Sequence, residues 1–352
     1  MAVDPEKLNA FMGKFVQDLG ANFHGPSVLI GEQLGLYKAL AAAGPSTSAQ
    51  LAERTGVGER YLREWLAAQA ASGYVEYDPT THQFSMTPEQ KFALTDEESP
   101  AYIPGAFYSA ASLYKDQRKI ADAVRAGNGL GWHEHHNDLF VGTRKFFRPG
   151  YLANLVSAWL PALEDVVPKL KAGAQVADVG CGLGASTIIM AKAFPKSKFL
   201  GFDYHLESIE WARNDAVSQG VTQNADFEFA TAKSFRGQDY DLVTFFDCLH
   251  DMGDPVGAVE HVRKSLKPDG TLMAVEPFAH EHLEENLNPV GRVFYSASML
   301  ICVPCSLSQE VGKGLGAQAS DSSLFEVFRA GGFTRVRKPV ETPFNRVFEA
   351  RP

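Results

Sequence analysis

The sequence has few cysteines, no long apolar run and no excess of basic charge. Four cysteines in 352 residues are too few for a disulfide framework. No stretch of 18 or more apolar residues occurs, and Met1–Lys7 lacks the basic and apolar segments of a secretory signal peptide. We therefore expect a cytoplasmic protein with free thiols and no contact with a membrane.

The charge balance is acidic. The chain has 33 Lys and Arg against 42 Asp and Glu, which gives a formal net charge of −9. Because nucleic acids are bound largely through cations that neutralise phosphates, tight nucleic-acid binding is not expected of the whole chain. The chain is longer than a single hydrophobic core usually supports. Its hydrophobic content of 45% is enough to form the cores of two domains.

The N-terminal part has the pattern of a winged helix. Residues 6–43 are predicted to be helical, because apolar residues such as Leu29, Leu36 and Leu40 recur at helical spacing up to a stop at Ala43-Gly44-Pro45. A short helix at Ser48–Arg54, a glycine turn, a second helix to about Ser72 and two short strand-like segments follow, which predicts a helix-turn-helix with a wing. We assign residues 1–95 to a mainly α-helical dimerisation domain and residues 96–172 to a helical linker and lid.

From Ala174 the pattern changes to apolar strands that alternate with helices. This alternation is typical of βαβ units and predicts an α/β domain with a seven-stranded, mostly parallel, Rossmann-like sheet in residues 173–352. The expected strands are 175–179, 198–203, 226–230, 241–246, 271–276, 333–338 and 344–349.

The first of these strands ends in a glycine-rich turn that opens a helix. Gly180, Gly182 and Gly184 allow a tight turn and a close approach to a ligand, and the helix start offers free N–H groups. Dinucleotide-binding dehydrogenases share such a turn. However, Asp178 stands where a nicotinamide fold usually keeps an apolar residue, and no tyrosine is followed four residues later by lysine, so NAD is the weaker alternative.

Two further segments favour a different adenosine cofactor. The second strand ends at Asp203, where a carboxylate can accept hydrogen bonds from ribose hydroxyls. The strand 241–246 leads into Asp247-Cys248-Leu249-His250-Asp251, and after a helix Leu266-Lys267-Pro268-Asp269-Gly270 precedes another strand. Together with the winged helix, these segments resemble class I methyltransferases that use S-adenosylmethionine, in the layout of bacterial winged-helix methyltransferases and small-molecule O-methyltransferases.

The resemblance implies a cofactor, a partner and a set of site residues. The cofactor would be S-adenosyl-L-methionine, the acceptor a small molecule, and the N-terminal domain would form a homodimer and close over the substrate. Asp203 would hold the ribose, and Asp247 would meet the cofactor's ammonium group. The other implied cofactor-binding residues are the three glycines with Asp178, Tyr204 on the adenine, Thr231-Ala232-Lys233 in place of the acid that often faces the adenine amino group, and Phe246.

His250 is the candidate general base. It lies four residues beyond a strand end, at the edge where open α/β sheets bind ligands, and it matches the base of the "HD" motif in similar plant-type O-methyltransferases. A histidine can remove a hydroxyl proton near neutral pH. His250 could instead cap the helix that begins near Asp251. The glutamate expected to orient the base corresponds to Gln318, and Glu276 is a reserve base.

The CxxC pair and the closely spaced histidines are weaker indications of function. The CxxC pair Cys302 and Cys305 has redox spacing, but it follows an apolar helical run and no second pair completes a zinc site. No metal site is expected, because closely spaced histidines on flexible segments are more often solvated than bound to metal. The closely spaced histidines are His133, His135 and His136 with Asp138, and His280 with His282.

The sequence therefore predicts a homodimeric enzyme that methylates a small hydroxyl compound. The alternative is a winged-helix regulator that binds DNA and senses S-adenosylmethionine or S-adenosylhomocysteine. In the winged helix, however, Arg54, Arg60 and Arg63 are interleaved with glutamates, which favours a dimer surface over a DNA-binding one. Methylation of a protein or an RNA is a third possibility.

Overall fold

The computed structural model describes residues 3–352, which fall into two compact units. Unit 1 takes in the chain up to Ala111 together with Val141–Pro149, and unit 2 takes in Ser112–Phe140 and Gly150–Pro352. Helices α6 (Ala106–Ala126) and α7 (Asp138–Asn154) each contribute residues to both units. The segment that the sequence assigns to a linker and lid is therefore divided between the two units.

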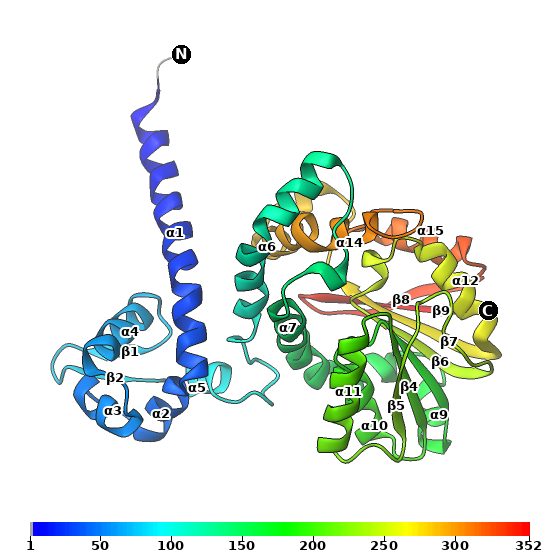
Figure 1. Ribbon diagram of the computed structural model, residues 1–352, viewed down its shortest axis with the longest axis horizontal. Coiled ribbons are helices and arrows are strands. Elements are labelled where there is room, and N and C mark those ends of the chain that lie inside the picture. The colour runs from blue at the N-terminus through cyan, green and yellow to red at the C-terminus, as the bar shows by residue number, and fades with distance from the viewer. Residues whose placement is uncertain (1–2) are drawn as a thin grey trace. The chain divides into compact units, whose positions relative to one another are not determined.

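Unit 1 has the predicted helix-turn-helix and wing (Figure 1). Thr47 and Thr87 each form a capping box with the glutamine three residues later, which fixes where the helices α3 and α5 begin. The core is formed by apolar residues such as Leu40, Leu62 and Leu66, all fully buried. The elements are α1 (Pro5–Gln33), α2 (Leu36–Ala43), α3 (Ser48–Thr55), α4 (Glu59–Ala71), β1 (Glu76–Asp78), β2 (Gln83–Ser85) and α5 (Pro88–Leu94).

Unit 2 is built on the predicted seven-stranded sheet. The strand order is β5-β4-β3-β6-β7-β9-β8, and β9 alone is antiparallel to its neighbours. The order reverses at β3, so the ends of β3, β4, β6 and β7 meet at one carboxyl edge. The strands are β3 (Gln175–Val179), β4 (Lys198–Asp203), β5 (Ala225–Phe229), β6 (Tyr240–Phe246), β7 (Leu266–Pro277), β8 (Arg335–Glu341) and β9 (Asn345–Arg351).

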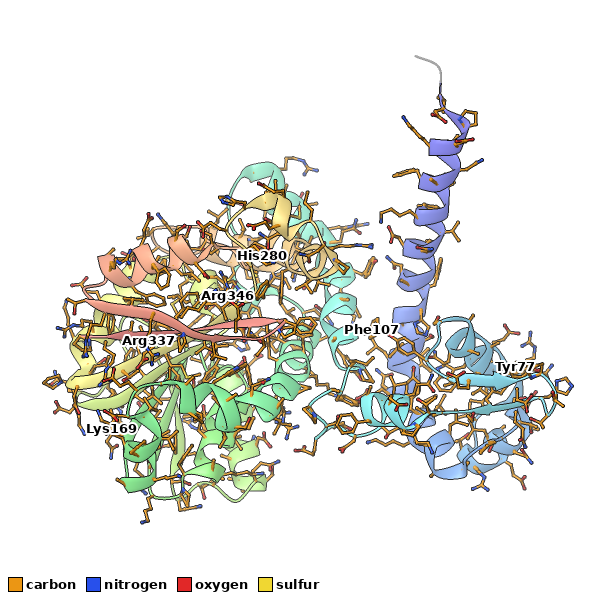
Figure 2. The ribbon with its side chains drawn as sticks, turned by 180° about the vertical axis from the view of Figure 1, so that it is seen from behind. Tyr77, Phe107, Lys169, His280, Arg337 and Arg346 are labelled. Atoms are coloured by element: carbon orange, nitrogen blue, oxygen red, sulfur yellow. The ribbon has the colours of Figure 1, made fainter. Side chains whose placement is uncertain are left out.

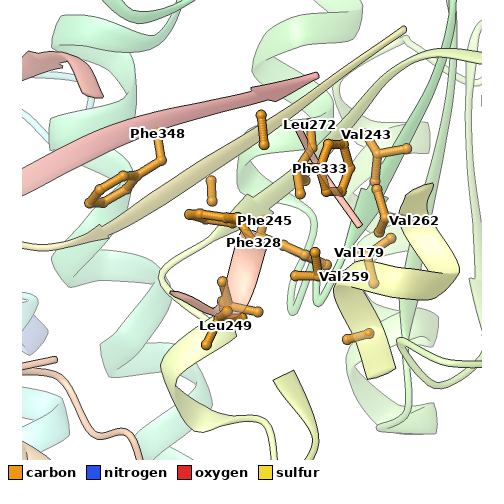
Figure 3. Packing of buried hydrophobic residues seen from close by; sticks show 14 of the residues in the cluster. Val179, Val243, Phe245, Leu249, Val259, Val262, Leu272, Phe328, Phe333 and Phe348 are labelled. Carbon is orange, nitrogen blue, oxygen red and sulfur yellow. The ribbon is translucent and has the colours of Figure 1, made fainter. Parts of the chain in front are cut away.

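Helices cover both faces of this sheet (Figure 1). On one face, α12 (Pro255–Ser265) and α15 (Asp321–Ala330) bury side chains against β6, β7 and β9 (Figure 3). On the other face lie α10 (Ala185–Ala193) and α11 (Leu206–Ser218). The remaining elements are η1 (Trp132–Glu134), η2 (Leu155–Trp159), α8 (Leu160–Ala162), α9 (Val166–Ala172), η3 (Leu249–Asp251), η4 (Leu283–Asn286), α13 (Pro289–Ala297), η5 (Ser298–Cys302) and α14 (Val303–Leu307).

The helical run Pro289–Leu307 is long and apolar enough to cross a membrane by length and composition alone, with a mean hydropathy of 1.4. In the structure 44% of this run is buried within the chain. Cys302 and Cys305 lie in it, and all four cysteines of the chain are free thiols. A helix in the core of a soluble protein can have the same length and apolar composition, so the run is weak evidence for a membrane span. A cytoplasmic location stays a prediction.

The reversed strand β9 places a buried arginine beside the carboxyl edge. Arg346 lies opposite Glu276 in the β7–β9 register and is 1% exposed (Figure 2). Its guanidinium donates to the carbonyl oxygens of Pro277 and Ala319 and to Asp321 Oδ1 at 2.8 to 3.0 Å. These bonds tie the end of β7 to the start of α15, which fixes the position of the residues that follow β7.

Replacement of Phe328 by alanine tests the packing of α15 against the sheet. Phe328 is fully buried between α12 and β9, so Phe328→Ala should lower the free energy of unfolding by about 3–5 kcal/mol. Urea denaturation measures this loss. The matched control Phe344→Ala removes a side chain that is 51% exposed and should change the stability by less than about 1 kcal/mol. Equal losses in the two variants would contradict this description of the core.

Candidate active site

The glycine turn between β3 and α10 has the shape that the sequence predicts. Gly180, Gly182 and Gly184 have φ of 73°, 50° and 77°, which favours glycine at each position. A Cβ on Gly180 would meet Cys248 Sγ at 2.7 Å, whereas a Cβ on Gly182 would meet nothing within 4 Å. The turn is therefore packed against the protein at its first glycine and open at its second, where a ligand can approach the backbone.

Asp203 lies at the end of β4 beside this turn. Its two carboxylate oxygens accept hydrogen bonds from the backbone N–H groups of Gly182 and His205, both at 2.9 Å. Burial raises the pKa of Asp203, and the backbone hydrogen bonds oppose that shift. Each oxygen keeps an acceptor position, so the carboxylate can take two further donors, as two neighbouring ribose hydroxyls would supply.

Asp178 lies beneath the turn, not at its surface. It is 1% exposed and accepts hydrogen bonds from the hydroxyls of Ser186 and Thr187 on α10 and of Thr244 on β6, at 2.5 to 2.9 Å. These bonds join the start of α10 to two strands. The geometry favours a supporting role for Asp178 beneath the turn, and direct contact of this residue with the cofactor stays a prediction.

The other residues expected around the adenine lie beyond β4 and β5. The Tyr204 ring is partly buried, and its hydroxyl is 3.9 Å from Cys305 Sγ. Thr231 Oγ1 is bonded to Ser234 Oγ at 2.8 Å, and Ala232 packs against the core. The Lys233 ammonium is paired with Asp254 and Glu310 at 2.9 and 2.8 Å. The roles of these residues toward a cofactor stay predictions.

Asp247 follows Phe246 at the end of β6, and both are buried. Its carboxylate accepts hydrogen bonds from the Tyr151 hydroxyl and the Asn345 side chain, both at 2.8 Å. Its backbone has φ of 51°, an unusual conformation for a residue with a side chain. Burial and the nearby Glu276 raise the pKa of Asp247 well above its usual range. A cationic ligand group would therefore stabilise the ionised carboxylate.

His250 lies in η3, one turn beyond the end of β6, and is 3% exposed. Its Nδ1 is 2.6 Å from Glu276 Oε2, and its Nε2 is 3.2 Å from Asp251 Oδ1. Burial lowers the pKa of His250, but Asp251 and Glu276 outweigh burial and raise the pKa well above its ordinary value. The site thus contains an imidazole whose orientation is fixed by a buried carboxylate.

The carboxylate beside His250 comes from β7 and not from the region of Gln318. Glu276 also accepts the backbone N–H of Leu249 at 3.1 Å, so it holds both the ring and the turn that carries it. Gln318 donates to the Phe278 carbonyl at 2.9 Å, and its Oε1 is buried without a hydrogen-bond partner among the described residues. The sequence indicates Glu276 only as a reserve base, whereas the geometry favours a positioning role.

Tyr151 and Asn345 were missed as partners of Asp247. They are 96 and 98 residues away from it in sequence. No pattern in the sequence indicates that the Tyr151 hydroxyl contacts Asp247. Asn345 reaches the site because β9 runs antiparallel beside β7, a pairing that no residue pattern indicates.

Two family models match the chain. A model described as a methyltransferase domain matches residues 170–312, and a model described as an Rv2258c-like winged HTH domain matches residues 26–96. The first covers the sheet from β3 to β7 with η3, and therefore includes the glycine turn, Asp203, His250 and Glu276. The second covers the helix-turn-helix and wing of unit 1.

Curated proteins match part of the chain. The ubiquinone biosynthesis O-methyltransferase of Actinobacillus pleuropneumoniae is 32% identical over 107 residues, which are 28% of this chain and 44% of that protein. The phosphoethanolamine N-methyltransferase 1 of Triticum aestivum is 27% identical over 131 residues, 37% of this chain and 26% of that protein. The chain thus spans less than half the length of these relatives.

Solved structures match the whole chain in fold. A candidate O-methyltransferase from Nostoc punctiforme has a TM-score of 0.73 at 18% identity, with 99% of each chain covered. Human N-acetylserotonin methyltransferase in complex with S-adenosylmethionine has a TM-score of 0.72 at 16% identity, with 100% of this chain and 99% of that one covered. The chain carries a methyltransferase domain of the class I fold joined to an Rv2258c-like winged helix-turn-helix domain.

Proposed function

We propose that the protein transfers the methyl group of S-adenosylmethionine to a hydroxyl group of a small molecule, and that His250 takes up the hydroxyl proton. The observation that carries this proposal is the 2.6 Å contact between His250 Nδ1 and Glu276 Oε2 at the carboxyl edge of the sheet. The methyltransferase model covers both residues and the glycine turn, which supports the same reaction.

The residues at the carboxyl edge fit this cofactor. The open side of Gly182 admits a ligand to the backbone, Asp203 has acceptor positions for the ribose, and Asp247 is a buried carboxylate suited to an ammonium group. The cofactor supplies a methyl group on a reactive sulfonium, for in-line displacement by the acceptor oxygen. Holding the two groups in line can supply about 7–11 kcal/mol of the barrier reduction.

Glu276 decides which nitrogen of His250 accepts the proton. A carboxylate at Nδ1 favours the tautomer that carries its hydrogen there, which leaves the lone pair on Nε2. Nε2 would then take the acceptor proton, and Glu276 would stabilise the imidazolium that results. Glu276 is therefore a positioning residue, and His250 is the catalytic residue.

A DNA-binding regulator receives less support. On α4, Arg63 is 2.6 Å from Glu59 and Arg60 is 2.5 Å from Glu64, so two cations of the winged helix are already paired. Those cations would have to leave their partners to neutralise phosphates. The wing and helices are consistent with the alternative role of such domains in methyltransferases, which is dimerisation.

We infer that a second copy of the chain covers helix α1. Between Leu8 and Phe23 this helix exposes a row of apolar side chains at helical spacing, which is unusual for a surface in water. Their exposed fractions lie between 43% and 75% for Leu8, Phe11, Met12, Phe15, Val16, Leu19 and Phe23. The resemblance to winged-helix methyltransferases makes an identical helix the expected partner.

Calorimetric titration tests the cofactor site. The protein should bind S-adenosylmethionine and S-adenosylhomocysteine and should not bind NAD. Asp203→Ala should weaken binding at least tenfold, because each hydrogen bond to a charged acceptor contributes about 1.5–3 kcal/mol. Asp226→Ala changes an exposed acid on the neighbouring strand and should leave the affinity unchanged. Binding of NAD in place of the sulfur compounds would contradict the proposed cofactor.

The pH profile of methyl transfer tests the role of His250. The base must be neutral, and its pKa is raised, so kcat/KM should rise with pH through the pKa of His250. Asp251→Asn removes a negative charge 3.2 Å from Nε2 and should move this rise to lower pH. The profile is measured in metal-free buffer with a chelator, and Asp226→Asn is the control. A rise that stays in place in Asp251→Asn would argue against His250 as the base.

Sedimentation velocity tests the proposed dimer. Phe11 and Phe15 are adjacent on the apolar face of α1 and are 66% and 49% exposed. The double variant Phe11→Glu with Phe15→Glu places two charges in that interface and should shift the protein from dimer to monomer. Gln17→Glu alters the polar face of the same helix and should remain dimeric. An unchanged dimer in the double variant would exclude this interface.

A further inference from the structure

Three potential metal ligands converge on the far side of His250 from Glu276. His250 and Asp251 come from η3, and Cys302 comes from the end of η5, about fifty residues later in the chain. One donor atom of each residue lies within 4.8 Å of the other two. His250 and Cys302 are 3% and 7% exposed, and Asp251 is partly buried. The three side chains thus bring one nitrogen, one oxygen and one sulfur donor together.

The geometry around His250 is that of a supported metal ligand. Histidines that bind metal usually donate their second ring N–H to a carboxylate, and Glu276 holds Nδ1 in that way at 2.6 Å. Nε2 is then directed at Asp251 Oδ1, 3.2 Å away. Two ligands of a tetrahedral zinc at about 2.0–2.1 Å lie about 3.3 Å apart, so this pair already has the required spacing.

The Asp251 carboxylate is poorly satisfied by the groups around it. Its Oδ1 is buried and accepts no hydrogen bond of regular geometry from a described residue, and the groups that interact with the carboxylate are His250 Nε2, 3.2 Å from Oδ1, and the Cys302 thiol. A buried acceptor with poor hydrogen bonding is unfavourable, and more so when it is charged. Burial and the nearby Asp251 also raise the pKa of the Cys302 thiol to about 12. A bound dication would compensate both groups, because it pairs with the carboxylate and stabilises the thiolate.

We propose that His250, Asp251 and Cys302 form a zinc-binding site. Imidazole, carboxylate and thiolate are all ligands of Zn²⁺, and three protein ligands leave a fourth position for water. Binding would displace the thiol proton of Cys302 and any proton on His250 Nε2 into solvent. The consequence for catalysis rests on the proposed function: zinc on Nε2 takes the lone pair that would accept the hydroxyl proton, so it would inhibit methyl transfer reversibly.

Cys305 offers a matched control on the same helical run. Its thiol is buried like that of Cys302, but its Sγ lies 3.4 Å from Gln309 Nε2 and 3.9 Å from the Tyr204 hydroxyl. It does not belong to the three-residue set. A thiol of the same type, three residues away, can therefore be removed without removal of a proposed ligand.

Titration of the reduced, full-length protein with Co²⁺, followed by displacement with Zn²⁺, tests the site without any acceptor or S-adenosylmethionine. One equivalent of Co²⁺ should give the thiolate-to-cobalt charge-transfer band and the visible bands of a tetrahedral complex. Cys302→Ser should lose the charge-transfer band, and Glu276→Gln should bind about 10–100-fold more weakly because the ring loses its support. Cys305→Ser should bind as the unaltered protein does.

The unaltered protein alone can overturn the proposal. Absence of a charge-transfer band at one equivalent of Co²⁺ would show that no thiolate site forms, whatever the folding of the variants. A band that is lost in Cys305→Ser but kept in Cys302→Ser would place the metal elsewhere. If the band forms and methyl transfer is never detected, the metal site stands and the proposed function fails. If methyl transfer occurs, added Zn²⁺ should inhibit it and a chelator should restore it.

Discussion

Burial of several carboxyl groups at one edge of a parallel sheet is the constraint on which the site depends. Four carboxyl groups, each at most 9% exposed, lie within one residue of the ends of the strands that share this edge: Asp178, Asp203, Asp247 and Glu276. A carboxylate taken out of water is costly unless donors or cations surround it. The local structure is therefore best described by the hydrogen-bond donors that surround each of these carboxyl groups.

The hydrogen-bond donors differ from one carboxylate to the next, and they determine how much capacity each carboxylate keeps for a ligand. Asp178 accepts three hydroxyls from its own domain, which leaves it little capacity for a ligand and makes it part of the framework. Asp203 accepts two backbone N–H groups and keeps acceptor positions for a ligand. Glu276 has the imidazole of His250 and one backbone N–H. The framework and the reactive part of the site are thus distinguished by how fully each carboxylate is satisfied.

Local patterns in the sequence predict the framework well. Strand periodicity, the glycine turn and the terminal acids each depend on neighbouring residues, so the sheet and its carboxyl edge could be predicted. The strand expected at 271–276 begins at Leu266 in the structure, because the Leu266-Lys267-Pro268-Asp269-Gly270 segment joins the ladder at Tyr240. The composition of this segment is typical of a turn, so the sequence pattern did not indicate that pairing.

Contacts between distant segments could not be predicted in the same way. The Asn345 contact with Asp247 depends on where the antiparallel strand β9 inserts in the sheet, and the Cys302 contact with His250 depends on how a helix near the C-terminus packs on η3. The sequence alone pointed to Gln318 as the group beside the base, because that expectation rested on spacing in other proteins. The register of β7 places Glu276 there instead.

The balance of charge around His250 connects the proposed reaction with the proposed metal site. Asp247, Glu276 and Asp251 lie near one imidazole, and a protonated His250 offsets only one negative charge. The remaining negative charge favours cations at two places: Asp247 lies beside Tyr151 and Asn345, whereas Asp251 lies beside Cys302. An ammonium group or sulfonium on the first side and a metal ion on the second would relieve the same electrostatic strain. Because only the second engages Nε2, the same excess of negative charge can support catalysis from one side and suppress it from the other.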